Sequence, residues 1–487
     1  MAGMTSARPL LLACLATVLT AGPGCGNKPS QPVPEATEAG VAKATVPAPL
    51  ELPARPLGLA EAAAFGWRTR GGHPAFREAR SAEARSAWPA VVERCRAALA
   101  ADPGHLEASW LLAAALGRLG QVDELLPPLR DAVAGDFGTW GLASLELPAL
   151  QAFLATPTGE AWRRRVEQDR SLFLAALARA TIVNAGGDLF AFDLESARWL
   201  RLTRTSGAVI SGLPVPGARK VAYVARLAAS GKRTLAIGVV DLSRGRTTRA
   251  IDLGTSGPLT IVHSTKAPVG FWIGAGAPKL TWRALADDHK LSALPAKTTR
   301  PAGPRLEVNG ASSRLTAVPV PTVTADWDEQ GLASAIRIGS SNRVVSAPSP
   351  GLIDGNTATW SPGKSHLAFV VQLDETCTPG AISSAAYVAD AATGTLTELE
   401  RAAKGLAIEW LTDRKLVIAG DRGVSIVDLD GGPPRMLAGA TNLVVPRRRP
   451  TCDPVEEPVL IDDPELAAGV EPAAGVEPAD GGLVEPP

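Results

Sequence analysis

The stretches ATWSPGKSHLAFVV (residues 358–371) and AYVADAATGTLTELE (residues 386–400) decide the fold of the larger part of this chain. Short apolar runs alternate with Ser, Pro and Gly in the first stretch and with Asp and Gly in the second, a pattern typical of short strands joined by tight turns. We expect Trp360 to act as a large apolar wedge, the following Ser-Pro-Gly to form a turn, and residues 367–370 to return as a buried strand. The two stretches therefore predict an all-β segment.

The same pattern recurs in six similar units between residues 181 and 446. Their shared phrase is a strand that ends in Asp, a tight turn, and a further strand; it occurs at Asp193, Asp241, Asp390 and Asp428. The units hold residues 188–202, 220–253, 259–294, 304–347, 358–399 and 408–437. A unit of about 45 residues with four short strands is typical of a propeller blade.

The segment WSPGK (residues 360–364), followed by HLAFV (residues 366–370), resembles the W-S-P-D-G-K…I-A-F phrase of TolB-like and WD-repeat-like propellers; the family's aspartate between Pro and Gly is absent here. The resemblance implies a β-propeller of about six blades over residues 179–450. The first unit lacks an innermost strand, so we predict that TNLVV (residues 441–445) pairs beside residues 181–183 and closes the ring. An open set of hairpins or a β-sandwich is the alternative.

Residues 59–178 have a helical pattern. Asp102 and Asp136 lie 34 residues apart in the related segments AADP and AGDF. Between them, residues 105–119 and 122–134 each predict one helix, with Gly120 at the turn and Pro127 and Pro128 as a local irregularity. The spacing and the small packing residues resemble tetratricopeptide repeats, which implies about two repeats and a cap over residues 137–166. A generic helical bundle is the alternative.

The first 25 residues have the layout of a signal peptide, because Arg8 precedes an apolar run (residues 10–21) that is too short to span a bilayer. Gly22, Pro23 and Gly24 then precede Cys25, which resembles a bacterial lipobox without the family's leucine. The resemblance implies acylation of Cys25 and a lipid-anchored protein of the cell envelope, in the outer membrane facing the periplasm or at the cell surface. An ordinary secretory signal that is cut nearby is the alternative.

The segments outside the two folded regions are rich in proline and predicted to be disordered. Residues 26–58 would form a tether with a reach of roughly 30 Å. Residues 451–487 form an acidic tail that repeats AGVEPA. The multidomain α+β chain is thus divided at residues 1–25, 26–58, 59–178, 179–450 and 451–487.

Two of the five cysteines, Cys377 and Cys452, occur in polar loop sequences of the predicted propeller and its tail. Export to an oxidising compartment permits a disulfide between them, and two unpaired thiols are the alternative. Cys95 has an interior helix position and is expected to be a buried thiol.

Composition and motifs give no sign of catalytic, metal or cofactor chemistry. The chain has 49 basic and 49 acidic residues, so no basic excess points to nucleic acid. None of the five histidines has a partner at metal-ligand spacing, and no Gly-x-Ser-x-Gly elbow occurs. We therefore predict no catalytic residue, no metal and no cofactor.

These features favour a membrane-anchored binding or scaffold lipoprotein that contacts a protein partner in the cell envelope, rather than an enzyme. A propeller enzyme or small-molecule binder is the alternative, because its site residues would come from several blades and leave no local motif. A purely structural envelope protein is a third hypothesis.

Overall fold

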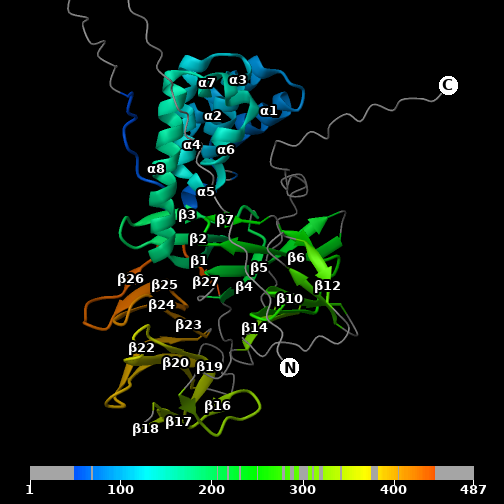
Figure 1. Cartoon of the computed structure of the whole chain (residues 1–487). Helices are drawn as coiled ribbons and strands as arrows, with labels where there is room; N and C mark the ends of the chain where they lie inside the picture. The colour runs from blue at the N-terminus through cyan, green and yellow to red at the C-terminus, as the bar shows by residue number, and fades with distance from the viewer. Residues whose placement is uncertain are drawn as a thin grey trace, which may run out of the picture. The chain divides into compact units, whose positions relative to one another are not determined.

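The structure is a computed structural model, and its described residues fall into two folded regions, one of helices and one of strands (Figure 1). The described residues are 49–66, 68, 70–205, 207–215, 219–229, 232–248, 250–276, 280–285, 290–294, 305–309, 312–316, 322–339, 343–373, 382–403 and 405–444. The helices and sheets belong to one compact unit, Leu50–Pro487.

The helical region extends to Arg179, and the first strand begins at Thr181. Its elements are η1 (Ala62–Phe65), α1 (His73–Glu83), α2 (Trp88–Ala101), α3 (Leu106–Arg118), α4 (Val122–Gly135), α5 (Phe137–Trp140), α6 (Ala143–Glu146), η3 (Pro148–Leu150), α7 (Gln151–Leu154) and α8 (Pro157–Arg179). Helices α3 and α4 agree with the two predicted helices within one residue at each end. The two prolines lie inside α4 without ending it.

Helices α1 to α4 stack as two consecutive hairpins, and the two related aspartates occupy equivalent places in them. Asp102 ends α2 with φ −147° and ψ 88°, and Asp136 ends α4 with φ −140° and ψ 68°. Each backbone N–H donates to the carbonyl four residues earlier, and each side chain is buried. The 34-residue spacing read from the sequence therefore marks the same structural position in both hairpins.

The described strands form six antiparallel sheets, A to F, that follow one another as propeller blades. Sheet A holds β27 (Asn442–Leu443), β1 (Thr181–Ala185), β2 (Asp188–Asp193) and β3 (Arg198–Arg201). Sheet B holds β4 (Val209–Val215), β5 (Lys220–Ala229), β6 (Lys232–Asp241), β7 (Arg246–Thr247) and β8 (Ile251–Asp252). Sheet C holds β12 (Leu291–Ala293), β11 (Thr281–Leu285), β10 (Gly270–Ala275), β9 (Leu259–Ser264), β13 (Arg305–Asn309) and β14 (Ser312–Thr316).

The remaining blades complete the series. Sheet D holds β15 (Val323–Thr324), β17 (Ala335–Ile338) and β18 (Arg343–Ser346). Sheet E holds β16 (Leu332–Ala333), β19 (Leu352–Trp360), β20 (His366–Gln372), β21 (Ser384–Asp390) and β22 (Leu396–Ala402). Sheet F holds β23 (Ala407–Trp410), β24 (Lys415–Gly420), β25 (Gly423–Asp428) and β26 (Arg435–Met436). Stacked helices followed by propeller blades confirm the predicted fold class.

The predicted closing strand is confirmed. Strand β27 pairs with β1 in sheet A, with Leu443 opposite Val183 and Asn442 opposite Asn184. Beyond it, the carbonyl of Val444 accepts a hydrogen bond from the backbone N–H of Gly212 in sheet B, at 2.9 Å. The C-terminal strand thus joins the first blade and also contacts the second, which covers a sheet edge that would otherwise be free.

The predicted limits of the fourth unit are wrong. Strands β13 and β14 do not belong to sheet D but extend sheet C, because β13 pairs with the edge of β9, with Leu306 opposite Ile261. Strand β16 pairs with β19, with Leu332 opposite Asp354, and so belongs to sheet E. A hairpin pattern in the sequence predicts two paired strands but not the edge that the hairpin joins, since that depends on which backbone groups lack partners.

The recurring strand-Asp phrase has a local structural cause. Asp241, Asp390 and Asp428 each accept a hydrogen bond from the backbone N–H two residues later, at 3.0, 2.8 and 3.0 Å. Asp193 does the same for Glu195 at 3.4 Å. These are Asx turns, which fix the hairpin after each strand. The phrase therefore specifies the blade turns and carries no chemistry of its own.

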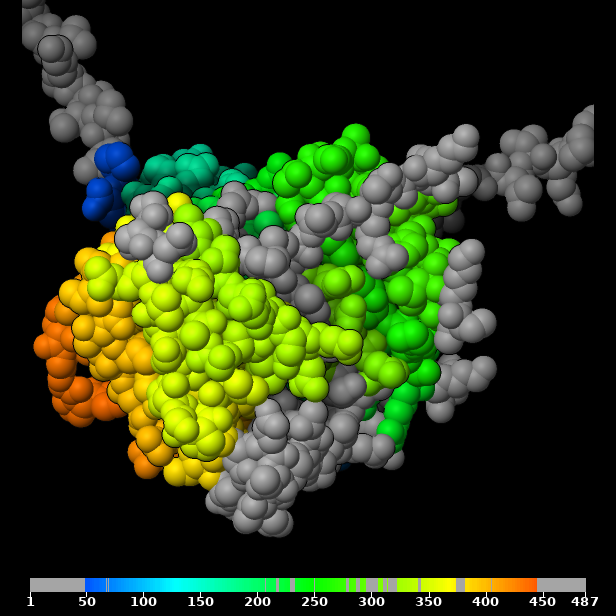
Figure 2. Space-filling model, turned by 90° about the horizontal axis from the view of Figure 1, so that it is seen from below, coloured from blue at the N-terminus to red at the C-terminus, as the bar shows by residue number. Residues whose placement is uncertain are grey.

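The buried apolar side chains form clusters between neighbouring sheets. Separate clusters lie between sheets B and C, between D and E, and between E and F. Figure 2 shows the yellow-green residues of sheets D and E between the orange residues of sheet F and the green residues of sheets B and C. Residues 367–370 are fully buried, as predicted, and Trp360 packs against the cluster between D and E.

The largest cluster is continuous from the helices into sheets A, B and F. The predicted end of the tether at residue 58 is wrong, because residues shortly before α1 pack on the core and add backbone contacts at this junction. Leu59 and Trp199 of β3 exchange two backbone hydrogen bonds, at 3.1 and 2.8 Å, and Gly58 donates to Ala134 of α4 at 2.7 Å. The helical region and the first blade thus share one core, so they are expected to fold as a unit.

Candidate functional site

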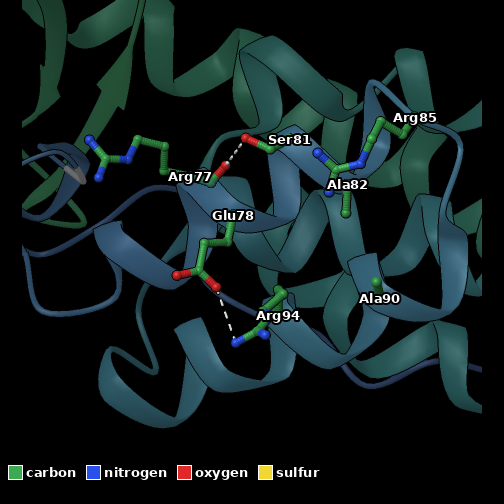
Figure 3. Close-up of a pocket in the computed structure, with 7 residues that line it drawn as sticks. All are labelled: Arg77, Glu78, Ser81, Ala82, Arg85, Ala90 and Arg94. Carbon is green, nitrogen blue, oxygen red and sulfur yellow. Dashed lines mark hydrogen bonds and ion pairs between the residues drawn. The ribbon is translucent and has the colours of Figure 1, made fainter.

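A shallow hollow on the described surface lies between α1 and α2 and is rich in arginine (Figure 3). Its volume is about 270 Å³. We call it the arginine pocket, and its lining consists of Arg77, Glu78, Ser81, Ala82, Arg85, Ala90 and Arg94. The volume is below the range of about 300–1,000 Å³ that is usual for drug-sized ligands, so the pocket suits a few side chains of a peptide.

Helical spacing brings these residues together. Arg77, Ser81 and Arg85 follow one another at four-residue intervals along α1 and its end, so they share one face. Ala90 and Arg94 have the same spacing on α2. Phe76, Ala79 and Ala82 turn toward the core, and Ala82 thereby forms the border between the core and the pocket. The small side chains of Ala82 and Ala90 leave the hollow open between longer neighbours.

The pocket carries more positive than negative charge. Glu78 and Arg94 form an ion pair across the two helices at 3.1 Å. Figure 3 shows the Arg77 side chain extending away from Ser81, and the Arg85 side chain turned back so that its guanidinium lies beside Ala82. In the described part of the chain, no carboxylate pairs with Arg77 or Arg85, and both side chains are exposed. Two guanidinium groups are thus available to an anionic ligand, with five donors each in a planar fork that fits a carboxylate.

A second charged cluster, the junction network, lies between the helices and sheet A. Arg201 of β3 donates from Nε to Asp136 at 2.7 Å and from a terminal nitrogen to Glu107 of α3 at 3.1 Å. The side chains of Arg201, Asp136 and Glu107 are 7 %, 0 % and 7 % exposed. Arg204 reaches the same Glu107 carboxylate at 3.5 Å.

The junction network is built to hold charge in the interior. Burial disfavours the charged form of Arg201, but the carboxylates of Asp136 and Glu107 outweigh burial and raise the pKa of the guanidinium. The guanidinium also lies 5.2 Å from the ring centre of Phe65 and 5.9 Å from that of Trp140. Because its charge is satisfied and shielded from solvent, this cluster joins the two regions and leaves no group free for a ligand.

Glu409 is the third charge feature. It lies on β23, the innermost strand of sheet F, and its Oε2 atom is shielded from solvent without a hydrogen-bond partner among the described residues. Burial raises the pKa of its carboxyl to about 7. A carboxyl group with this pKa exchanges a proton near neutral pH, as general acids and bases do.

Ser365, His366 and Asp390 contact one another in the order of a hydrolytic triad, but the geometry does not suit catalysis. Ser365 and His366 are adjacent in the chain, with 2.9 Å between Oγ and Nδ1. Asp390 is 3.9 Å from Nε2 and already accepts hydrogen bonds from Ala392 and Thr393 of its own turn. Arg414 lies 3.3 Å from the same Nε2. We interpret the group as part of the blade turn.

The site residues predicted from sequence lie mostly outside the described part of the chain. This holds for the proposed lipidation site Cys25 and for both members of the proposed disulfide, Cys377 and Cys452. Cys95 is a buried free thiol, as expected, and burial raises its pKa to about 12, so it is a poor nucleophile. Among the described residues, no three His, Cys, Asp or Glu side chains are grouped to hold a metal ion.

Sequence reasoning missed the arginine pocket, the junction network and Glu409. The pocket had a weak signal, namely arginines at four-residue spacing, which is also typical of an ordinary solvated helix face. Arg201 had none, because its partners are 65 and 94 residues away in the sequence. No described helix is long and apolar enough to cross a bilayer.

Comparisons with known proteins add a distant likeness of fold. No family model and no curated protein matches the chain. The structure is similar to TolB from Acinetobacter baumannii, at 14 % identity over 58 % of this chain and 69 % of that chain, with a TM-score of 0.29. The propeller domain of the trilobed protease from Pyrococcus furiosus matches at 14 % identity over 47 % of this chain and 70 % of that one, with a TM-score of 0.18.

An enzyme of the GH74 group from Niastella koreensis matches at 13 % identity over 51 % of this chain and 43 % of that one, with a TM-score of 0.25. The likeness to TolB and to the trilobed protease propeller is a distant one to β-propeller proteins. The fold itself is established by the sheet order described above, and nothing about activity follows from these similarities.

Proposed function

We propose that this chain is a lipid-anchored binding protein of the cell envelope whose helical region captures an acidic segment of a protein partner while the propeller serves as its rigid support. The observation that carries the proposal is the arginine pocket, with Arg77 and Arg85 exposed and without carboxylate partners in the described part of the chain. Arg-rich clusters are a recurring means of recognising acidic motifs.

The repeat geometry supports a binding role. Two hairpins with equivalent ends at Asp102 and Asp136 match what a tetratricopeptide-like array would have, and such arrays use their exposed helix faces to bind peptides. Two hairpins are a short array, since three or more repeats are usual for an independent solenoid. Support from a neighbouring domain is therefore needed.

The junction network supplies that support. It links α3, the end of α4 and β3 through buried charged hydrogen bonds. The second hairpin is thus fixed to the first blade, and α2, which lines the pocket, packs against α3 of that hairpin. A binding site on a rigid base loses less conformational entropy when a ligand binds. In this proposal the TolB-like propeller is the scaffold that supports the helices.

The proposed anchor is acylated Cys25, followed by residues 26–49 as a tether. Residues 50–58 are not part of it, because Leu50 accepts a hydrogen bond from Arg164 of α8 and Gly58 donates one to Ala134 of α4. Such a tether would hold the helices and propeller roughly 30 Å from an outer-membrane surface, on its periplasmic side or at the cell surface. A nucleic-acid partner does not fit this proposal, because the chain has zero formal net charge.

The test is an affinity pull-down of the full-length protein extracted from membranes, with mass spectrometry of the mature N-terminus and of the captured proteins. We expect acylated Cys25 and a stoichiometric envelope protein with an acidic segment. The capture should fall in Arg77→Gln/Arg85→Gln and persist in Arg163→Gln/Arg170→Gln, which removes two exposed arginines from α8. An unmodified N-terminus would refute the anchor, and equal capture by both variants would refute the pocket.

Glu409 favours one alternative, a propeller that binds or converts a small molecule. A half-buried carboxyl with a pKa of about 7 on an innermost strand is the kind of group that such a site would use. Screening metabolite extracts for ligands that stabilise the full-length protein but not Glu409→Gln would test it. A ligand that raises the melting temperature of both proteins equally would argue against this residue.

A further inference from the structure

We infer that the arginine pocket binds the chain's own acidic C-terminal segment, residues 451–487, so that this segment competes with an external partner for the same site. The competition rests on the proposed function, which supplies the external partner. The docking of the segment in the pocket does not depend on it. Its structural basis is the pair of exposed arginines, Arg77 and Arg85, beside a floor made by Ala82 and Ala90.

Charge complementarity selects this segment from the rest of the chain. Residues 451–487 contain ten Asp or Glu residues and no Lys or Arg, although the whole chain is electrically balanced. The pocket has the opposite bias, because Glu78 offsets Arg94 alone and leaves the charges of Arg77 and Arg85 without a counter-ion in the described residues. Opposite fields of this kind favour association and suppress other partners.

A repeated tripeptide gives the match more detail. Val-Glu-Pro occurs three times, around Glu471, Glu477 and Glu485. Each copy offers one carboxylate between two compact apolar residues. A guanidinium of the pocket can hold the carboxylate in a bidentate pair, while the valine and proline contact the alanine floor between the helices. Proline next to the glutamate also restricts the backbone, which lowers the entropy lost on binding.

The intervening chain is long enough for docking within one molecule. Glu471 is 27 residues beyond Val444, the last described residue, and an extended chain of that length spans roughly 90 Å. A compact unit of this size has a radius of gyration of about 21 Å, so every point on its surface is within reach. Binding in the same molecule gives an effective concentration on the order of 1 mM, so even a weak motif is bound for a good part of the time.

Three copies of the motif raise the occupancy further, because each can replace another at the pocket. An external acidic segment must then displace an internal one, which lowers its apparent affinity and favours partners that bind through additional contacts. The tail would thus act as a built-in competitor that sets a threshold for capture.

The test measures binding of a fluorescein-labelled peptide, AAGVEPAAGVEPAD (residues 467–480), to the purified full-length protein by fluorescence anisotropy. The key variant is Glu471→Gln/Glu477→Gln/Glu485→Gln, which keeps the shape of the tail and removes the three carboxylates. We expect it to bind the peptide about threefold more tightly than the unmodified protein, because the internal competitor is lost. Arg77→Gln/Arg85→Gln should bind at least about fivefold more weakly, and the control Arg163→Gln/Arg170→Gln should bind like the unmodified protein.

Equal peptide affinity of the glutamine-tail variant and the unmodified protein would overturn the inference, as would loss of binding in the α8 control. Dimers in sedimentation velocity that disappear in the tail variant would show that the segment binds a second copy, which also overturns docking within one molecule. Because no partner is present, failure here leaves the pull-down result intact. Conversely, a failed pull-down does not affect the peptide measurement.

Discussion

The two arginine clusters of this protein contain the same side chain in opposite settings. In the junction network, Arg201 is buried and holds two carboxylates from a different region of the chain. In the arginine pocket, Arg77 and Arg85 are exposed on a helix face, and no carboxylate in the described part of the chain holds them. The first arrangement fixes the fold, and the second leaves charge available at the surface.

The difference shows why the number of charges says little about function. A buried guanidinium needs its partners, since removal of one partner leaves an uncompensated charge in a poorly solvated interior. An exposed guanidinium costs little to keep and little to remove, so its presence is not explained by stability. A cluster of the second kind is therefore where a ligand should be sought. Substitutions in the two clusters should have correspondingly different effects.

The largest effect is expected at the junction. Arg201→Met removes the guanidinium and its contacts with the rings of Phe65 and Trp140. It leaves Asp136 buried without a counter-ion and Glu107 with Arg204 alone, at 3.5 Å. The free energy of unfolding should fall by about 3–5 kcal/mol, which urea unfolding followed by tryptophan fluorescence can measure.

Adding Asp136→Asn and Glu107→Gln to Arg201→Met provides the control, because it removes the buried negative charges as well. Most of the lost stability should return, since neutral amides cost less to bury than carboxylates. A loss of less than about 1 kcal/mol in Arg201→Met alone would show that the network is not what joins the helices to the blade.

A smaller effect is expected for Glu409, a half-buried carboxyl whose Oε2 atom is shielded from solvent and has no counter-ion among the described residues. Its pKa is raised from 4.5 to about 7, so the folded state keeps the proton over a pH range in which the unfolded state has lost it. The carboxyl therefore contributes full stability below pH 4.5, and that contribution is lost as the pH rises to about 7. Glu409→Gln should be more stable than the unmodified protein by roughly 1–3 kcal/mol at pH 7.

The measurement is the unfolding free energy of both proteins at several pH values between 4.5 and 7.5. The two curves should converge near pH 4.5 and separate toward pH 7. Glu93→Gln, at an exposed position of α2, should show no such pH-dependent difference. Parallel curves for Glu409→Gln would mean that the carboxyl is charged in the folded protein throughout the range.

How much the sequence could predict depends on how local each feature is. The related aspartates Asp102 and Asp136 and the blade turns at Asp241 and Asp390 were predictable, because a hydrogen bond or a repeat period fixes them. The closing strand was predictable although its partner β1 is far away in the sequence, because the first unit lacked a strand that the last segment could supply. The edge joined by β13 was not, since pairing with β9 is a choice between distant backbone groups.

The candidate site divides in the same way. Arg201 could not be assigned a role from sequence, because Glu107 and Asp136 become its neighbours only when the first blade packs on the helices. The arginines of the pocket were visible as a helical spacing, but exposed charge at this spacing is usual on solvated helices. What distinguishes Arg77 and Arg85 from such residues is that no carboxylate in the described part of the chain pairs with them, and this can be seen only in the folded chain.

The smallest effect on stability is expected at the arginine pocket. Arg77→Gln/Arg85→Gln should change the free energy of unfolding by less than about 0.5 kcal/mol, because both side chains are exposed and hold no ion pair in the described structure.

Binding of the acidic peptide should weaken in the same variant. For the unmodified protein it should also weaken as sodium chloride rises from 0.05 to 0.5 M, because the screening length of surface charges falls from about 14 Å to about 4 Å over this range. The decrease in the free energy of unfolding caused by Arg201→Met should change little over the same salt range, because the carboxylate partners of Arg201 are shielded from solvent. Parallel urea and anisotropy series on the two variants measure both dependences. A pocket variant as unstable as Arg201→Met, or peptide binding indifferent to salt, would remove the distinction between an arginine that holds the fold and one that holds a ligand.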